Sequence, residues 1–427
     1  MFTPSRRWLR VAWLTAVMVA ALVLVPLSAQ AAGKLLLEKG DRVAVVGDSI
    51  TEQKIYSRFI EDYLTVCVPD LDLSIVQLGW SGETAAGFNR RMNQDLMPLK
   101  PDVVTTCYGM NDGRYRAYDD GIGKSYRDPT TAIVGALKQA GVTVLVGSPG
   151  VVDSKTWRGD SAVYNQNLAR LRDIARDVAQ AHGMPFANVH DTMMDVMKKA
   201  KAAYGADYHV AGGDGVHPSS NGQLVMAYAF LKGLGLDGNL GTITMDATGK
   251  TTATGGHHVI SCDGGKAEIQ STRYPFCFFG NDTSPNSTRT ILPFLPFNQD
   301  LNRLVLVVRN LKAASAKVTW GAASKTFTRD QLATGVNLAG EFPDNPFAEA
   351  FRRVDQKVGA KQNFETFLIK QCNHMLAGIG RTLGDDAEAA AAMKTLQARL
   401  LARHAQLAAD VRKALVPVTH TIAVSTP

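Results

Sequence analysis

The stretch "VAVVGDSITEQ", Val43 to Gln53, is an apolar run that stops abruptly at glycine, aspartate and serine. Consecutive apolar, largely β-branched residues are typical of a buried strand, and the polar residues after Gly47 favour the start of a helix. Ser49 therefore stands where a buried strand meets a helix. Two interpretations stay open here: Ser49 caps the helix, or it is a nucleophile at the edge of a sheet.

From Arg42 to about Leu236, short apolar segments alternate with helical ones. The strand-type segments include "LSIVQLG", "DVVTTCYG" and "VTVLVGS". Regular alternation with near-continuous apolar strands predicts an α/β unit with a parallel sheet covered by helices on both faces. The carboxyl ends of such strands share one edge of the sheet, and ligands bind at that edge.

The residue composition changes after about Gly238, and the pattern along the whole chain predicts four segments. Residues 1–31 are predicted to be a signal peptide and residues 32–238 the α/β domain. Residues 239–343, rich in Thr and Gly with alternating apolar residues, predict a smaller β-rich accessory region. Residues 344–427 predict C-terminal helices followed by a short strand. The last helix, about 386–415, carries an apolar face expected to pack on its own protein.

The N-terminal segment has the order of a secretory signal. Arg6, Arg7 and Arg10 precede an apolar run from residue 11 to 27, and the small-residue pattern Ala29-Gln30-Ala31 follows. We expect cleavage before Ala32 and export to the periplasm or the extracellular space, with an uncleaved membrane anchor as the alternative. Cleavage removes three arginines and no acidic residue, so the net charge of +7 falls to +4. That excess predicts no nucleic-acid partner.

Five cysteines are an odd number for an exported protein, so at least one thiol is expected to be free. None lies in a C-x-x-C arrangement or beside histidines at metal-binding spacing, so we predict no metal site and no cofactor. Two pairings, Cys262 with Cys277 and Cys67 with Cys107, stay open.

Four strand-end segments carry residues that suit acyl transfer. A serine nucleophile needs a base, a group that orients the base, and donors for the oxyanion. His217 and Asp214 share the segment "GGDGVHPSSNG", three residues apart, while Gly82 in "GWSG" and Asn111 in "GMND" offer amide donors. Each residue alone is equally compatible with a structural role in a turn.

Together, "GDSI", "GWSG", "GMND" and "DGVHP" in this order resemble the block motifs of the SGNH (GDSL-like) hydrolase family, over about residues 34–237. The resemblance implies a flavodoxin-like three-layer α/β/α sandwich. It implies that Ser49 is the nucleophile, supported by Asp48, with His217 as base and Asp214 as its partner.

The same resemblance implies an oxyanion hole formed by the N–H groups of Ser49 and Gly82 and the side chain of Asn111. Many relatives have an asparagine where this chain has Gln77, which leaves the support of that loop to be determined. No Gly-x-Ser-x-Gly motif is present, which disfavours a classical α/β-hydrolase.

These observations predict a secreted serine esterase that cleaves carboxylic esters through an acyl-enzyme. The substrate is a small-molecule or polysaccharide ester, and deacetylation of a polysaccharide is one option. Trp320 and the aromatic "YPFCFFG" either stack on sugars or form β-sheet core. The alternatives are a lysophospholipase or thioesterase, an acyltransferase, or a non-catalytic carbohydrate-binding protein. We predict no stable membrane span after signal cleavage, and the sequence carries no signal for the oligomeric state.

Overall fold

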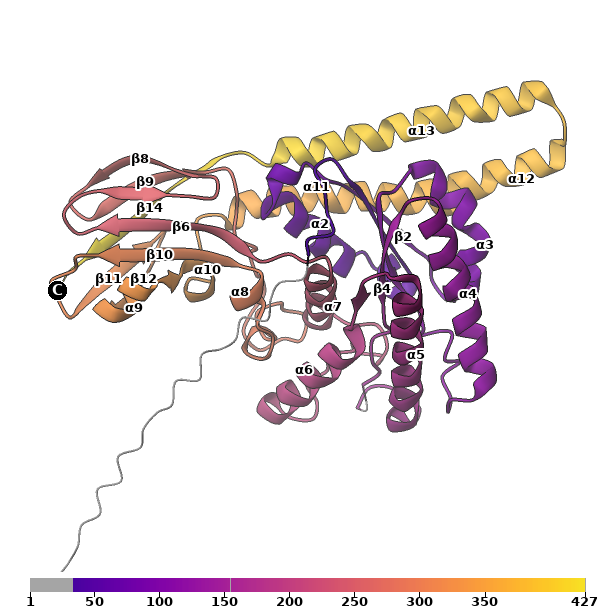
Figure 1. Ribbon diagram of the computed structural model, residues 1–427, viewed down its shortest axis with the longest axis horizontal. Coiled ribbons are helices and arrows are strands. Elements are labelled where there is room, and N and C mark those ends of the chain that lie inside the picture. Colours follow the sequence, from indigo (N-terminus) through magenta and orange to yellow (C-terminus); the bar gives the residue numbers. More distant parts are fainter. Residues whose placement is uncertain (1–33, 154, 427) are drawn as a thin grey trace, which may run out of the picture.

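The computed structural model describes residues 34–153 and 155–426 (Figure 1). The predicted signal peptide, residues 1–31, lies outside the described residues, so cleavage before Ala32 stays a prediction.

The N-terminal unit is built on a five-stranded parallel sheet with the strand order β2-β1-β3-β4-β5, as in flavodoxin-like folds. The predicted parallel sheet is therefore confirmed. Val45 of β1 pairs with Gln77 of β2, and Val43 of β1 pairs with Val103 of β3. The strands are β1 (Arg42–Gly47), β2 (Ser74–Gly79), β3 (Val103–Cys107), β4 (Thr143–Gly147) and β5 (Phe186–Ala187).

Alternate residues of each strand point to opposite faces, which separates two apolar layers. Val43 and Val45 lie in one cluster with α2, α6 and α7, while Ala44 and Val46 lie in the other with α3, α4 and α5. The helices are α1 (Ser49–Glu52), α2 (Tyr56–Val66), α3 (Ala85–Asp95), α4 (Asp120–Gln139), α5 (Ser161–His182), α6 (Val189–Tyr204) and α7 (Ser220–Gly233), with short 3-10 turns η1 (Pro69–Leu71) and η2 (Met97–Leu99).

A β-rich region follows, in which two further sheets have the orders β13-β10-β6-β7 and β12-β11-β14-β9-β8. The chain's last strand, β14, lies between β11 and β9 in the second of these sheets, so the C-terminus returns to this region (Figure 1). The strands are β6 (Asn239–Asp246), β7 (Thr251–Ala253), β8 (His257–Asp263), β9 (Lys266–Ser271), β10 (Arg303–Arg309), β11 (Ser315–Trp320), β12 (Ala323–Thr328), β13 (Val336–Asn337) and β14 (Val418–Ser425), with the short helices η3 (Leu292–Phe294), α8 (Phe297–Asp300), α9 (Arg329–Thr334) and α10 (Leu338–Glu341).

The aromatic residues of this region form its core. Trp320 and Tyr274 are fully buried, and Phe276 contacts Phe297 and Phe351 edge-on or tilted. Of the two interpretations offered by the sequence, stacking on sugars is therefore wrong for these side chains, because no sugar reaches a fully buried ring.

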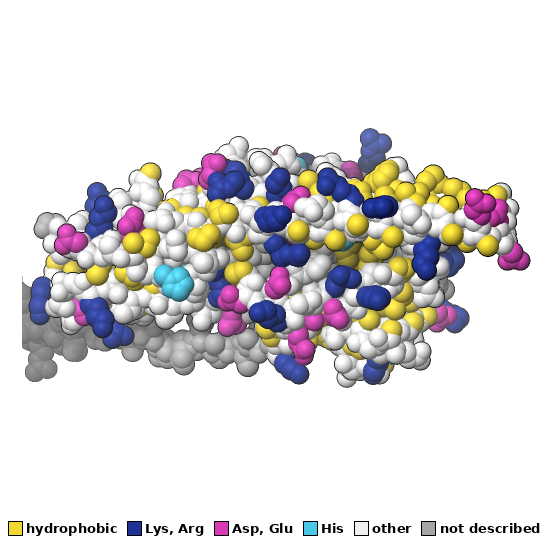
Figure 2. All heavy atoms as spheres, turned by 90° about the horizontal axis from the view of Figure 1, so that it is seen from above, with side chains coloured by type: hydrophobic (Ala, Val, Ile, Leu, Met, Phe, Trp, Pro, Cys, Tyr) yellow, Lys and Arg dark blue, Asp and Glu magenta, His cyan; other side chains and the backbone are white. Residues whose placement is uncertain are grey.

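A long helical arm connects the β-rich region with the α/β unit. It consists of α11 (Ala348–Phe367), the π-helical turn η4 (Leu368–Asn373), α12 (His374–Leu383) and α13 (Ala387–Ala414), and α12 and α13 form a hairpin (Figure 1). The predicted apolar face of the last helix packs only in part: Val411 is buried, but Leu396 is 44% exposed. Figure 2 shows hydrophobic atoms along this hairpin and both signs of charge interspersed over the same face of the molecule.

Helix α11 covers the free edge of strand β2. An edge strand leaves every second N–H and C=O without a partner strand, and burying such groups unpaired is costly. Here Lys361 Nζ donates to the carbonyl of Ile75 at 2.8 Å, and Glu365 Oε2 accepts from the N–H of Gln77 at 3.0 Å. Two side chains of one helix therefore replace a sixth strand.

The two side chains that seal this edge are themselves a buried ion pair. Lys361 contacts Glu365 at 2.5 Å and Glu61 of α2 at 3.1 Å, and His404 of α13 contacts Glu365 at 2.7 Å. Burial opposes the charge of Lys361, but the carboxylates of Glu365 and Glu61 raise the pKa of Lys361 overall. The arm thus stays charged at its contact with the sheet.

Replacing Lys361 by methionine, a side chain of similar length, is expected to lower the free energy of unfolding by about 3–5 kcal/mol, because Glu365 and Glu61 lose the buried ammonium group that they share. The control is Lys357→Met on the exposed face of the same helix, expected within about 0.5 kcal/mol of wild type. Urea unfolding of both variants tests this. Equal stabilities would contradict the role assigned to the ion pair.

Candidate active site

The three residues predicted as a catalytic triad lie together at the carboxyl edge of the sheet. Ser49 Oγ is 2.8 Å from His217 Nε2, and His217 Nδ1 is 2.7 Å from Asp214 Oδ2. Ser49 and His217 are 168 positions apart in the chain. A hydroxyl, an imidazole and a carboxylate are therefore connected in the order that acyl transfer by a serine nucleophile requires.

The residue that caps helix α1 is Asp48 and not Ser49. Asp48 Oδ1 accepts from the N–H of Ile50 at 3.0 Å, and Asp48 is buried with only 3% of its surface exposed. Ser49 occupies the first helical position instead, where its hydroxyl contacts the imidazole. The interpretation of Ser49 as an N-cap is therefore wrong, and the supporting role of Asp48 in the site stays a prediction.

Asp214 holds the histidine loop in shape as well as the imidazole. Its Oδ1 accepts from the N–H groups of Val216 and His217, both at 2.9 Å. Partial burial alone would raise the pKa of Asp214, but these two N–H groups and the imidazole lower it below its usual value. The carboxylate stays ionised and can stabilise an imidazolium on His217.

The loop from Gly79 to Thr84, here called the oxyanion loop, follows strand β2. Gly82 has φ +71°, and a Cβ there would meet nothing within 4 Å, so glycine is needed for the backbone conformation rather than for space. Gly79 differs, because a Cβ there would lie 2.2 Å from the backbone nitrogen of Glu52. Helix α1 packs directly on this end of β2.

Two backbone donors of the predicted oxyanion hole are free to bind. Glu52 Oε2 accepts from the N–H of Ser81, and the carbonyl of Trp80 accepts from the N–H of Glu83 at 3.2 Å. Among the residues that the structure describes, none accepts from the N–H of Gly82 or of Ser49. These two groups therefore remain available to a developing oxyanion.

Asn111 is held in one orientation by two hydrogen bonds. Its Nδ2 donates to the carbonyl of Glu83 at 3.0 Å, and its Oδ1 accepts from the hydroxyl of Tyr115 at 3.0 Å. The amide nitrogen keeps a second N–H for the oxyanion. Asp112, the next residue, accepts from the N–H groups of Ala85 and Gly109, both at 3.0 Å, and so joins this turn to helix α3.

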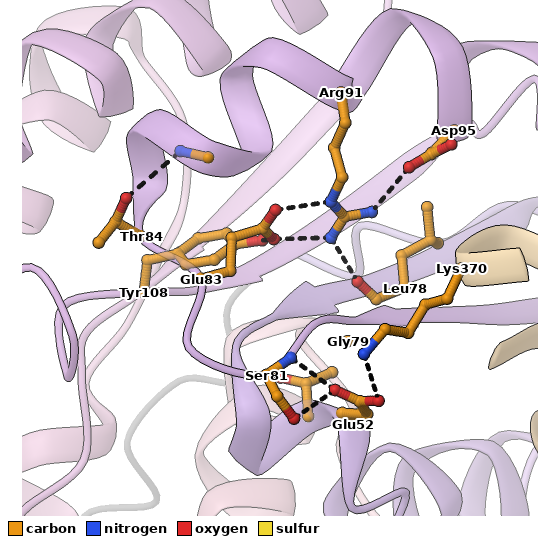
Figure 3. A network of polar contacts seen from close by, with 12 residues as sticks. Glu52, Leu78, Gly79, Ser81, Glu83, Thr84, Arg91, Asp95, Tyr108 and Lys370 are labelled. Carbon is orange, nitrogen blue, oxygen red and sulfur yellow. Dashed lines mark hydrogen bonds and ion pairs between the residues drawn. The ribbon is translucent and has the colours of Figure 1, made fainter. Parts of the chain in front are cut away.

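Sequence reasoning missed a buried ionic network behind the oxyanion loop (Figure 3). Arg91 of α3 donates to both carboxylate oxygens of Glu83 at 2.7 Å and contacts Asp95 at 3.4 Å. The hydroxyl of Tyr108 also donates to Glu83, at 2.7 Å. A signal for it exists: Arg91 and Asp95 lie on the buried stripe of α3 that also carries Phe88. A charged residue on such a stripe needs a partner.

Sequence reasoning also missed an aromatic cluster beside the triad. Tyr115 stacks on Tyr164 with ring centroids 5.1 Å apart, and Trp157 lies 5.3 Å from Tyr164. Tyr115 is 41% exposed and has φ +54°, which non-glycine residues rarely adopt. The backbone of Trp157 packs against Gly215 in the histidine loop. The exposed ring of Tyr115, packed on the buried Tyr164, therefore lies near the site.

Gln77, the departure from the family pattern, supports the oxyanion loop. Its Oε1 accepts from the N–H of Gly79 at 2.9 Å, and its Nε2 donates to Thr366 at 2.8 Å. The longer side chain thus holds the start of the loop and also reaches helix α11.

All five cysteines lie in the described residues and none forms a disulfide. The two pairings left open by the sequence are therefore not formed, and Cys107 instead contacts the carbonyl of Ser148. Across residues 34–153 and 155–426, no group of three or more potential ligands is placed to hold a metal ion. Within the same residues, no helix has both the length and the apolar character needed to cross a bilayer.

Comparison with known proteins agrees with this geometry. Residues 45–225 match the GDSL-like lipase/acylhydrolase family. An acetylxylan esterase of Geobacillus stearothermophilus is 23% identical over 220 residues, which cover 46% of this chain and 95% of that protein. The family match and this relative indicate an ester-cleaving hydrolase. The chain thus contains, at residues 45–225, a domain that matches the GDSL-like lipase/acylhydrolase family.

A solved structure shares the whole architecture. The structure of a gut microbial diltiazem-metabolizing enzyme matches 92% of this chain and 98% of its own length, with a TM-score of 0.71 and 19% sequence identity. At this identity the likeness concerns the fold alone. The β-rich region and the helical arm therefore occur together with the α/β unit in a second protein.

Replacing Asp48 by asparagine tests whether the buried Asp48 carboxyl changes how the free energy of unfolding depends on pH. Burial, together with the charges of Asp112 and Glu83, raises the pKa of Asp48 to about 7 from its ordinary 3.8. The folded protein thus holds a proton that the unfolded chain releases, so Asp48 makes the wild type lose stability as the pH rises from about 4 to about 7. Asp48→Asn, which keeps an acceptor for the helix cap, is expected to lose less stability than wild type between about pH 5 and pH 7.

The measurement is the free energy of unfolding from urea titrations at both pH values. Asp330→Asn, at a highly exposed position, serves as the control and should follow the wild-type slope. Identical slopes for wild type and Asp48→Asn would show that Asp48 does not retain a proton in the folded state.

Proposed function

We propose that this protein is an exported serine esterase in which Ser49, His217 and Asp214 form the catalytic triad. The observation that carries the proposal is the continuous contact from Ser49 Oγ through His217 to Asp214, with distances of 2.8 and 2.7 Å. The available N–H groups of Ser49 and Gly82 and the fixed amide of Asn111 support an oxyanion hole at the same place.

In the proposed reaction, Ser49 Oγ attacks the ester carbonyl while His217 Nε2 takes the hydroxyl proton. The negative charge moves to the carbonyl oxygen, which accepts hydrogen bonds from Ser49, Gly82 and Asn111. The intermediate then collapses and the bond to the alkoxide breaks; His217 gives its proton to the alkoxide, which leaves as the alcohol, and the acyl group remains on Ser49 Oγ as the acyl-enzyme. Water, deprotonated by His217, attacks the acyl group and releases the acid, and the proton returns to Ser49.

For the substrate, we propose an acetyl ester on a polysaccharide. One support is the similarity to an acetylxylan esterase, which covers 95% of that protein's length. A second is the exposed ring of Tyr115 beside the triad, since aromatic rings pack well against the apolar faces of sugars. A lysophospholipase or thioesterase is the alternative enzyme. A non-catalytic carbohydrate-binding protein is the alternative outside catalysis.

Replacing Ser49 by alanine is expected to lower kcat/KM at least roughly 1000-fold on p-nitrophenyl esters, because the acyl-enzyme is not formed. Ser324→Ala, at an exposed position of β12, should keep wild-type activity. The series runs from acetate through butyrate to octanoate, and acetylated xylan is added with release of acetate as the readout.

A preference for acetate supports the proposed substrate class, whereas rates that rise towards octanoate favour the lysophospholipase or thioesterase. Wild type that is inert on every ester, or equal in activity to Ser49→Ala, would overturn the serine esterase.

Export is proposed from the N-terminal sequence, in which three arginines, an apolar run and an A-x-A pattern follow one another. Expression of the full chain in a bacterial host should place a protein that begins at Ala32 outside the cytoplasm. Mass spectrometry of the fractionated protein measures this. A cytoplasmic protein that retains residues 1–31 would contradict export.

A further inference from the structure

The helical arm reaches the oxyanion loop through one lysine. Lys370, in the π-helical turn η4, contacts Glu52 Oε1 at 2.7 Å. The other oxygen of Glu52 accepts from both the N–H and the hydroxyl of Ser81, the residue before Gly82 (Figure 3). A chain of three side chains therefore runs from the C-terminal arm to the backbone of the loop.

The arm also contacts Trp80 of the oxyanion loop. Lys370 Nζ lies 4.9 Å from the ring centroid of Trp80, and the ring of His374 lies 4.8 Å from it. His374 Nε2 in turn contacts Asp95 of α3 at 2.9 Å, next to Arg91. Side chains of the arm thus contact Trp80 in the first half of the oxyanion loop, while Arg91 of α3 pairs with Glu83 in the second half.

The π-helical turn explains why these side chains face the loop. Lys361 and Glu365 are four residues apart and both face strand β2, as the period of an α-helix requires. Lys370 follows after five residues, the repeat of a π-turn, and His374 follows after four more. The wide turn thus brings Lys370 and His374 onto the side of the helix that carries Lys361 and Glu365.

Through Glu52 and Ser81, Lys370 can affect the position of the Gly82 N–H. Because Glu52 occupies the N–H of Ser81, the peptide that follows presents the N–H of Gly82 without a protein partner among the described residues. Glu52 is only partly buried, at 18% side-chain exposure, and its second oxygen is held by Lys370. Removing the lysine frees the carboxylate to turn towards water and to release Ser81.

We propose that Lys370 is a positioning residue: the C-terminal arm fixes Glu52, and through Ser81 fixes the Gly82 N–H where the oxyanion forms. This inference rests on the proposed serine esterase. It makes the arm a part of the active site rather than an accessory, and it assigns the π-helical turn a role in catalysis. Misplacing an oxyanion donor by about 1 Å weakens transition-state binding more than ground-state binding.

The test compares Lys370→Met with Lys370→Arg in the full chain, with p-nitrophenyl acetate as substrate. Lys370→Met is expected to lower kcat roughly tenfold while KM changes less than about twofold, because the interaction is made in the transition state. Lys370→Arg, which can still pair with Glu52, should recover most of kcat. Lys357→Met on the exposed face of α11 should leave both parameters unchanged.

A second variant, Glu52→Gln, removes the ion pair between Lys370 and Glu52 from the other side. It should lower kcat by a similar factor, and the double variant Glu52→Gln/Lys370→Met should lose little more than either single one, since both act through one chain of contacts. Unchanged kcat in Lys370→Met would overturn the proposal. So would a fall in kcat that Lys370→Arg does not rescue, or one that only follows a fall in melting temperature. Failure of the esterase itself would appear separately, as activity that survives in Ser49→Ala.

Discussion

The structure depends on one buried ion pair at the free edge of its parallel sheet. Lys361 and Glu365 satisfy the outward C=O and N–H of strand β2, so the edge is closed by side chains of a helix some 290 residues away. A lysine and a glutamate are tolerated there because each neutralises the other and each also bonds to the backbone. Strand β2 leads into the oxyanion loop, so this contact places the arm beside the candidate active site.

The site itself is assembled from strand ends that meet at one edge. Ser49 follows β1 and the oxyanion loop follows β2, while Asn111 follows β3. Parallel strands bring these ends together whatever their separation in the chain. The loops are then fixed by buried carboxylates, each with a distinct partner: Asp48 caps α1, Asp112 joins the turn after β3 to helix α3, and Glu83 pairs with Arg91. Such partners leave the Ser49 and Gly82 N–H groups without an acceptor among the residues that the structure describes.

Much of this follows from local sequence. The alternation of apolar strands and helices predicts the sheet, and the motifs at the strand ends predict which residues converge. The Glu83–Arg91 pair escaped prediction because charged residues in a helix usually face solvent, and burial is a property of the fold. The helices of the arm were predicted, but their contact with the oxyanion loop was not, because a spacing of four, five and four residues is not an α-helical stripe. Its packing on β2 joins elements remote in sequence, for which local patterns carry no information.

The sequence by itself determined the parallel sheet and the candidate residues Ser49, Gly82, Asn111, Asp214 and His217, because strand periodicity and loop motifs are local. The tertiary structure alone decided that Asp48 is the cap, that the aromatics around Trp320 are core, and that Lys370 reaches the oxyanion loop. The physical reason is that capping, burial and ion pairing depend on which groups are neighbours in space. Only the folded chain sets those neighbours.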